Sequence, residues 1–199
     1  MTAAALDRWE DPYLRAVARR LRHHYDLERG VRVAGEHFPM VAHLQMTNHK
    51  HLFHPSLRYA DHTMFEHVLV TDVDSPTRAT IQRFIEVGHT LAADPDYLDP
   101  SPEHYSTSFT IVLRCRELPE ALVPVVEQHR ERTLLRHGYH GQYTVEMVTV
   151  SPETQQLAAS AEAEIAPAFA TWAELPTPES RRLSARLATA VRGLLSGGD

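Results

Sequence analysis

Apolar residues recur at helical spacing near the start of the chain. The apolar stripe consists of Leu14, Val17, Ala18, Leu21 and Tyr25. This spacing predicts an amphipathic helix from about residue 11 to residue 28. Asp11 followed by Pro12 is typical of an N-cap and a first helical position, and Gly30 is expected just beyond the end of the helix.

Two later segments show the same helical spacing. One helix is expected from about 74 to 93, opened by Asp74, Ser75 and Pro76, and another from about 119 to 137, with Gly138 as its stop. The stripe of the first comprises Ile81, Phe84, Ile85, Gly88 and Leu91. The stripe of the second comprises Leu122, Val125, Val126, His129 and Thr133.

Four segments alternate with a period of two or form short apolar runs, and both patterns predict strands. They span about 36–46, 64–72, 107–115 and 142–150. The first, third and fourth each have one apolar side, formed by Phe38, Met40, Ala42, Leu44 and Met46, by Phe109, Ile111, Leu113 and Cys115, and by Tyr143, Val145 and Met147. The second is apolar on both sides from 68 to 70, which predicts a central position in the sheet.

The end of the chain carries two further helix-opening signals. Ser151-Pro152-Glu153 and Thr177-Pro178-Glu179 each combine a capping residue, a first-turn proline and a first-turn acid. They predict two C-terminal helices, the second with a stripe of Leu183, Leu187, Ala190, Val191 and Leu194.

The order of these elements predicts the fold class. The order α-β-β-α-β-α-β-α-α permits right-handed crossovers between strands that are separated by helices. We therefore expect a mixed α/β (α+β) protein, a two-layer sandwich with a four-stranded mixed sheet. Helices would lie mainly on one face, the other face would be more polar, and the terminal helices would pack on an edge or on the second face.

Chain length and periodicity together predict the domain organisation and the core. At 199 residues the chain suits one globular domain over 1–199, with an α/β core at 11–150 and a helical extension at 151–199. Six side chains on the apolar sides of their elements are expected to be buried: Leu44, Val70, Ile85, Ile111, Val126 and Val145.

Composition narrows the function classes. The net charge of −6 disfavours general binding to nucleic acid. No apolar run is long enough to span a membrane, and the first residues do not resemble a secretory signal. Cys115 is the only cysteine, which excludes a disulfide framework and favours a reducing, cytoplasmic location.

The opposite sides of the strands predict a ligand site. Successive residues of a strand point to opposite faces, so polar residues should converge on the face away from the helices. These residues are His37, His43, Gln45, Thr110, Arg114, Thr144 and Glu146, joined by either Glu66 or His67. The candidate ligand-binding residues are His43, Glu66, His67, Arg114 and Glu146, with His43 and Glu146 expected on one face. An ordinary solvated or dimer-forming sheet face is the alternative.

A histidine-rich loop predicts a second kind of site. The chain holds 14 histidines, and four of them, His49, His51, His54 and His62, fall in a segment expected to be a loop. Imidazole is a common ligand of divalent metals such as zinc, although no recognised metal-binding spacing is present. The acidic segment from Asp94 to Glu103 only superficially suggests calcium, because it lacks the central glycine of a calcium loop.

The sequence alone does not identify an activity, and two function classes stay open. The first is a protein that binds a small ligand or a divalent metal on a sheet face lined by His, Glu and Arg, with catalysis as an option. The second is a non-catalytic interaction protein, a homodimer assembled through its helices or its sheet face. The motifs of dinucleotide-binding folds, of P-loop nucleotide hydrolases and of the common serine hydrolases are all absent.

Overall fold

The computed structural model describes residues 9–51 and 58–175, and for 48–51 and 58–61 it describes the backbone alone. Seven strands form one open, mixed sheet in this part of the chain. They are β1 (Asp26–Val33), β2 (Glu36–His51), β3 (Arg58–Asp72), β4 (His104–Arg114), β5 (Arg132–Leu134), β6 (Gln142–Ser151) and β7 (Gln156–Ala159). The spatial order is β1-β2-β3-β4-β6-β5, with β7 also paired to β6.

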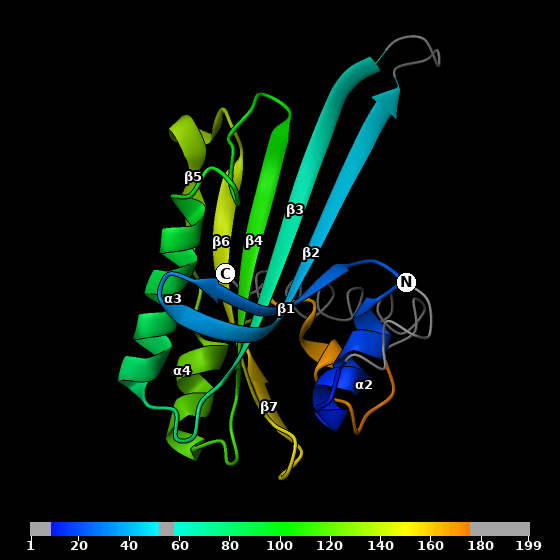
Figure 1. Cartoon of the computed structure of the whole chain (residues 1–199). Coiled ribbons are helices and arrows are strands. Elements are labelled where there is room, and N and C mark those ends of the chain that lie inside the picture. Colours follow the sequence, from blue (N-terminus) through cyan, green and yellow to red (C-terminus); the bar gives the residue numbers. More distant parts are fainter. Residues whose placement is uncertain (1–8, 52–57, 176–199) are drawn as a thin grey trace, which may run out of the picture.

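Two strand pairs are parallel and the others are antiparallel. The parallel pairs are β3 with β4 and β4 with β6, and the chain between each of these pairs crosses over one face of the sheet. The long antiparallel hairpin of β2 and β3 extends beyond the rest of the sheet (Figure 1).

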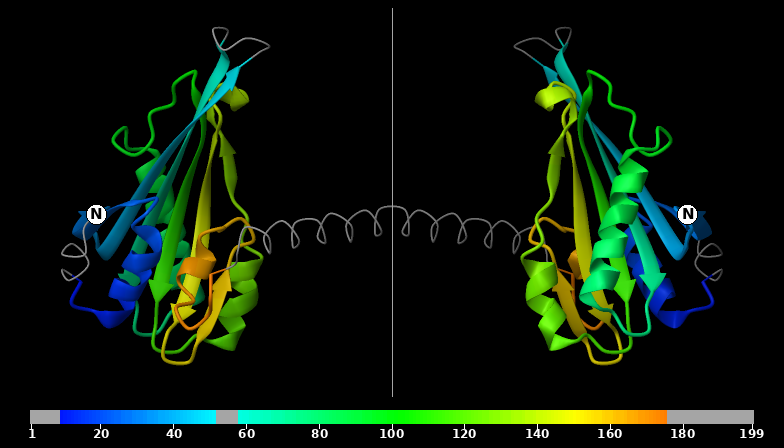
Figure 2. Two further views of the ribbon diagram at one scale, coloured as in Figure 1. Left: turned by 90° about the vertical axis from the view of Figure 1, so that its right-hand side faces the viewer. Right: turned by 90° about the vertical axis from the view of Figure 1, so that its left-hand side faces the viewer.

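Helices cover both faces of the sheet. α3 (Arg78–Ala92) and α4 (Val123–Glu127) lie on one side, and α2 (Pro12–Leu21) lies on the other (Figures 1 and 2). Three short 3₁₀-helices complete the described chain: η1 (Glu120–Leu122), η2 (Leu135–Gly138) and η3 (Ala166–Ala168). We call the two sides the α3 face and the α2 face.

Each face has its own apolar core. On the α3 face, Phe109, Ile111 and Leu113 of β4 and Val145 of β6 pack against the stripe of α3. On the α2 face, a second cluster combines strand residues with α2 and the 160–175 segment. Its strand residues are Met40, Ala42, Val68, Val70, Val112, Val148 and Val150. The strands of a sheet that is covered on both sides have apolar residues on both sides, which explains the continuous run of apolar residues in β3.

The α3 helix matches its predicted stripe. Ile81, Phe84, Ile85, Gly88 and Leu91 are all buried. The helix begins later than expected, because Thr77 is the N-cap and exchanges hydrogen bonds with Thr80 in a capping box.

Arg20 ties the C-terminal end of the described chain to α2. Its Nη1 donates to the carbonyl oxygen of Ala170 at 2.9 Å, and its Nη2 donates to that of Ala173 at 2.6 Å. Further bonds reach the carbonyls of Pro167 and Thr171. The segment that covers the α2 face is therefore held by one guanidinium group with several backbone acceptors.

The predicted class is confirmed in its coarse form, and its details need correction. The fold is mixed α and β, but the sheet has seven strands in the described chain where four were expected. The face away from α3 is not a polar face, because α2 covers it and it buries the second core. The expected two layers are three over much of the sheet (Figure 2).

Three predicted helical segments adopt other structures. Residues 26–28 belong to β1, so the first helix ends at Leu21. The segment 128–137 includes β5 and η2, so the helix expected there ends at Glu127. Ser151-Pro152-Glu153 begins the turn between β6 and β7 and not a helix. The last predicted helix, opened by Thr177, lies outside the described residues.

The β1–β2 hairpin reverses its faces at one position. Leu27 packs on the α2 face, whereas Val31 on the same strand packs on the α3 face. On β2, Phe38 lies on the α3 face, whereas Met40 lies on the α2 face. The reversal occurs at Gly30, with φ +64°, and at Pro39, which has no N–H to donate. Alternate residues of β2 therefore do not all lie on the same face of the sheet.

The predicted core is largely confirmed. Five of the six side chains, those of Val70, Ile85, Ile111, Val126 and Val145, are buried. The sixth, Leu44, is only half-buried.

Gly88 provides a test of the contact between α3 and β6. A Cβ added at Gly88 would lie 2.6 Å from Cγ1 of Val145, a buried side chain. We expect Gly88→Ala to lower the free energy of unfolding by about 1–3 kcal/mol, because overpacking outweighs the gain of about 1 kcal/mol in helix propensity. Denaturation in urea would measure this.

The matched rescue variant is Gly88→Ala combined with Val145→Ala, which removes the clashing methyl groups. The double variant should lose less stability than the sum of the two single variants. A stabilised Gly88→Ala protein would show that α3 does not approach β6 this closely.

Candidate functional site

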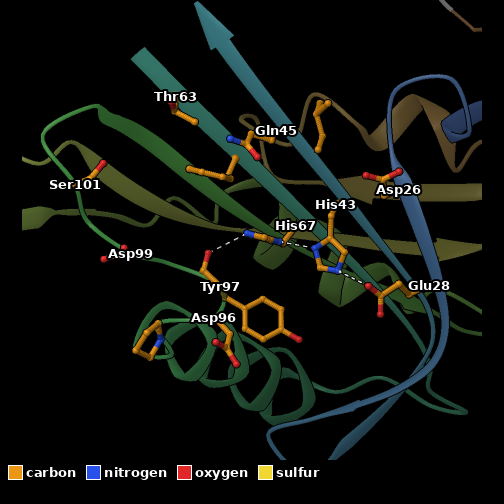
Figure 3. A pocket seen from close by; sticks show the side chains of 13 residues that line it. Asp26, Glu28, His43, Gln45, Thr63, His67, Asp96, Tyr97, Asp99 and Ser101 are labelled. Atoms are coloured by element: carbon orange, nitrogen blue, oxygen red, sulfur yellow. Dashed lines mark hydrogen bonds and ion pairs between the residues drawn. The ribbon is translucent and has the colours of Figure 1, made fainter. Parts of the chain in front are cut away.

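A cavity of about 680 Å³ opens on the α3 face, between the first three strands and the loop that follows α3. β1 contributes Asp26 and Glu28, β2 contributes His43 and Gln45, β3 contributes Thr63, Phe65 and His67, and the loop contributes Asp96, Tyr97 and Asp99 (Figure 3). Volumes of 300–1,000 Å³ are typical of sites for small organic ligands.

Two histidines from neighbouring strands meet at the base of this cavity. His43 and His67 are directly paired across β2 and β3. Their Nδ1 atoms are 2.7 Å apart, and Nε2 of His67 lies 3.1 Å from the carbonyl oxygen of Tyr97 (Figure 3). The His67 ring also stacks on Phe109, with centroids 5.3 Å apart, which fixes its plane.

The carbonyl of Tyr97 determines how both imidazoles are protonated. A carbonyl oxygen only accepts hydrogen bonds, so Nε2 of His67 carries the proton and donates it. In a neutral ring Nδ1 of His67 is then the acceptor, and Nδ1 of His43 must be the donor. The remaining nitrogen, Nε2 of His43, therefore carries a lone pair. It lies 3.9 Å from Glu28 Oε1, at the cavity.

Burial keeps both imidazoles neutral. The pKa of His67 is lowered from 6.5 to about 4, mainly by burial and also by the neighbouring His43, while the hydrogen bond to the Tyr97 carbonyl acts in the opposite direction. Burial also lowers the pKa of His43, although Glu28 and Asp26 act in the opposite direction. At neutral pH the pair therefore presents an uncharged acceptor to the cavity.

The walls of the cavity are acidic. Asp26 and Glu28 approach from β1, and Asp96 and Asp99 approach from the loop (Figure 3). No lysine or arginine is among the described residues that line it. The loop is held in place by Asp94, whose carbonyl accepts from the N–H groups of Tyr97 and Leu98. The buried side chain of Leu98 anchors it to the core.

A second, smaller cavity of about 370 Å³ lies on the α2 face. Glu146 projects into it and accepts hydrogen bonds from Thr110 and Thr144, both at 3.0 Å. Burial raises the pKa of Glu146 from 4.5 to about 7. Glu66 also lines this cavity, where Tyr25 donates to its Oε2 at 2.6 Å, and burial raises its pKa.

The predicted ligand residues divide between the two faces. His43 and His67 lie on the α3 face, whereas Glu66 and Glu146 lie on the α2 face. The prediction that His43 and Glu146 share a face is wrong. The two residues lie on different faces because helices cover both sides of the sheet, and the apolar sides of β2 and β4 therefore point in opposite directions.

Arg114 is occupied by ion pairs. It lies on the α2 face, and its Nη1 donates to Asp11 at 2.7 Å, while Nη2 donates to Asp72 at 2.9 Å. These bonds join the start of α2 to the ends of β3 and β4. The guanidinium group is therefore part of a structural network.

The predicted metal-binding histidines are only partly described. His49 and His51 are in β2 and not in a loop, but their side chains lie outside the described residues, as does His54 entirely. His62 is in β3, with its ring 5.4 Å from that of Tyr105. Among the side chains described, no group of three or more His, Cys, Asp and Glu residues is arranged to hold a metal ion.

The sequence-based prediction did not include several residues that line the cavity, among them Asp26, Glu28, Asp96 and Tyr97. Asp26 and Glu28 were assigned to a helix, although Gly30 two residues later is a signal for an irregular strand. Tyr97 contributes a backbone carbonyl, which no side-chain pattern can indicate. Asp96 was considered only for calcium.

A third polar cluster lies on the α3 face, away from the cavity. Nε2 of His89 lies 2.8 Å from Glu131 Oε1, and its Nδ1 lies 3.1 Å from the hydroxyl of Tyr143. All hydrogen-bonding atoms of this imidazole are paired, and the cluster connects α3 to β6 and to the start of β5.

These observations define a mixed α and β protein with helices on both faces of an open sheet and an acidic, histidine-based cavity. The chain belongs to the family described as a domain of unknown function (DUF8052), whose model matches residues 10–171. That range contains every residue of the cavity. Neither a curated protein nor a solved structure matches the chain. Among residues 9–51 and 58–175, no helix is both long and apolar enough to cross a membrane.

Proposed function

We propose that the protein binds a small molecule in the cavity on the α3 face, with Nε2 of His43 as the acceptor that orients the ligand. The observation that carries this proposal is the chain of hydrogen bonds from His43 through His67 to the Tyr97 carbonyl. It holds the imidazole in one orientation and one tautomer before any ligand arrives.

Preorganisation of this kind supports a binding role. A buried imidazole, that of His67, and a half-buried one, that of His43, both with lowered pKa values, lower the stability of the fold in acid, so their placement has a cost. Perturbed titratable groups that converge on a concave site favour a functional role over a purely structural one. The Nε2 atom of His43 is the only ring nitrogen of the pair without a short hydrogen bond among the described residues.

The same atom is the candidate general base of the site. If the ligand carries an acidic proton, Nε2 of His43 can accept it while Nδ1 keeps its bond to His67. The imidazolium ion formed in this way would be stabilised by Glu28 and Asp26. His67 would stay neutral, since its Nε2 keeps its proton and donates it to the Tyr97 carbonyl oxygen.

Nitrogen-detected NMR of the histidine rings tests the proposal. The free protein should show His43 protonated at Nδ1 and His67 protonated at Nε2. Screening a library of small molecules should yield compounds that shift the Nε2 resonance of His43. The variant His43→Gln should abolish their binding without a change in the far-UV spectrum.

His37→Gln is the matched control, because His37 is an exposed histidine on the same strand. It should leave binding unchanged. A His43 that is protonated at Nε2 in the free protein would contradict the proposal, as would a library in which no compound shifts its resonance.

Zinc binding by His49, His51, His54 and His62 and assembly into a homodimer remain predictions from the sequence. The cavity on the α3 face has stronger support, because its acceptor, its walls and its volume all lie within the described residues.

A further inference from the structure

We infer that the ligand of this cavity is a small organic cation, a protonated amine that donates an N–H to Nε2 of His43 and is neutralised by Glu28 and Asp26. This inference rests on the binding role proposed above and specifies the chemistry of the ligand.

The lining of the cavity is negatively charged, which favours a cationic ligand. Four carboxylates line the cavity, those of Asp26, Glu28, Asp96 and Asp99, and no lysine or arginine does so among the described residues. Within the described chain, the one contact of these four carboxylates with a basic side chain is that of Glu28 Oε1 with the neutral His43, at 3.9 Å. The cavity therefore holds acidic groups that no basic side chain of the lining neutralises. Its potential attracts cations and repels anions.

The histidine pair favours a ligand that donates a hydrogen bond. A neutral imidazole with an exposed lone pair accepts a hydrogen bond and donates none at that atom. A carboxylate or phosphate ligand would offer a further acceptor to this atom, next to Glu28. An ammonium group offers up to three donors, which suit one imidazole nitrogen and two carboxylates.

The volume and the aromatic residues of the cavity favour an organic cation over a metal ion. A single metal ion would fill only a small part of about 680 Å³, whereas an organic cation with several carbon atoms would fill much more of it. Phe65 and Tyr97 are among the lining residues, and aromatic rings favour contact with cations. An apolar or aromatic body attached to the amine would fit these walls.

Acidification should weaken the binding of such a ligand. Protonation of His43 removes the lone pair and adds a positive charge at the same position. The titratable groups that face His43 are Asp26 and Glu28 from β1, His67 from β3, and Tyr97 with Asp96 from the loop. Protonation of any of the carboxylates acts in the same direction, because it reduces the negative charge.

Matched probes of one shape test the inference. Benzylamine, benzyl alcohol and benzoate differ mainly in charge and hydrogen bonding, and zinc chloride represents a metal ion. The probes, together with a library of similar matched trios, are titrated against the full chain while the Nε2 resonance of His43 is followed. We expect the amines to bind more tightly than their neutral and anionic partners, and to bind more weakly below pH 6 than at pH 7.5.

Charge-removing variants give the second measurement. Glu28→Gln and Asp26→Asn should each weaken benzylamine binding, by up to about fivefold for a partly exposed pair. Glu36→Gln is the matched control, because Glu36 lies on the same hairpin, pairs with Arg83 and does not line the cavity. It should leave the affinity for benzylamine unchanged.

The outcomes separate the two proposals. If alcohols, acids or zinc shift His43 at lower concentrations than the amines, the inference about the ligand is wrong and the binding role stands. The inference is equally wrong if Glu36→Gln weakens amine binding as much as Glu28→Gln does. If no member of the library shifts His43, both the ligand class and the binding role fail.

Discussion

Replacing Glu146 with glutamine will raise the free energy of unfolding at pH 8 by about 2–3 kcal/mol. Burial raises the pKa of this carboxyl from 4.5 to about 7, so the folded state binds its proton more tightly than the unfolded state. The stabilisation is complete below pH 4.5 and is lost as the pH rises through 7. Above that pH the protein buries a carboxylate on the α2 face at a cost that glutamine avoids.

Glutamine suits the hydrogen bonds around this position. The carboxylate accepts from the hydroxyls of Thr110 and Thr144. The amide can accept from one hydroxyl and donate to the other, which rotates to accept. No buried polar group is left without a partner, so the gain in stability is not offset by a lost bond.

Chemical denaturation at pH 4, 6 and 8 measures the effect. Glutamine and glutamate should give similar stabilities at pH 4 and diverge as the pH rises. The exposed Glu120 provides a control, since Glu120→Gln should change the stability by less than about 0.5 kcal/mol at each pH. A Glu146→Gln protein less stable than the wild type at pH 8 would show that the carboxylate is needed in its ionised form.

Between pH 6.5 and pH 4, protonation linked to His67 lowers the free energy of unfolding by about 3 kcal/mol, and replacing His67 with glutamine will abolish this decrease. Burial lowers the pKa of His67 from 6.5 to about 4, so the unfolded state binds a proton before the folded state does. The contribution of this group is present above pH 6.5 and is lost as the pH falls through 4. A glutamine takes up no proton in this range.

The variant will also lower the stability at pH 7, because the stacking of His67 on Phe109 and the bond to His43 are lost. The diagnostic quantity is therefore the slope of stability against pH and not the value at one pH. Acid titration followed by near-UV circular dichroism measures it, with His23→Gln on the exposed surface as the control. An unchanged acid slope in His67→Gln would contradict the neutral state of the histidine pair.

The two groups produce opposite slopes over the same range. As the pH rises from 4.5 to 6.5, the contribution of Glu146 to the free energy of unfolding decreases, while the contribution of His67 increases. We expect their contributions to cancel to within about 1 kcal/mol in the wild type. Each single variant should reveal the slope of the other group. The double variant should be flat again, since the residues lie on opposite faces and act independently.

Local signals predicted the elements whose neighbours in the sequence decide their structure. Pro12 and the Asp11 cap determine where α2 begins, and the stripe from Ile81 to Leu91 determines the buried side of α3. Cap geometry and side-chain spacing act over one or two turns, so they can be read from a short window.

The same signals failed where distant contacts overrode them. Residues 26–28 continue a helical spacing, but they pair with β2 because the hairpin satisfies their backbone groups. The segment 128–137 begins with helical spacing as well, yet the ring of His129 bonds to the Val145 carbonyl and β5 pairs with β6. Neither pairing is visible in a local pattern.

The amino-acid sequence by itself determined which residues of β4 and of β6 share a side, because alternation is a property of a strand without interruption. Only the tertiary structure decided which side faces which helix. Helices on both faces make either orientation of an apolar side favourable, and the reversal at Gly30 and Pro39 changes it within one hairpin. The pairing of His43 with His67, and the backbone carbonyl of Tyr97 that orients them, arose from strand register and loop path. Side-chain patterns carry neither, and for that reason the cavity could not be assembled from the sequence.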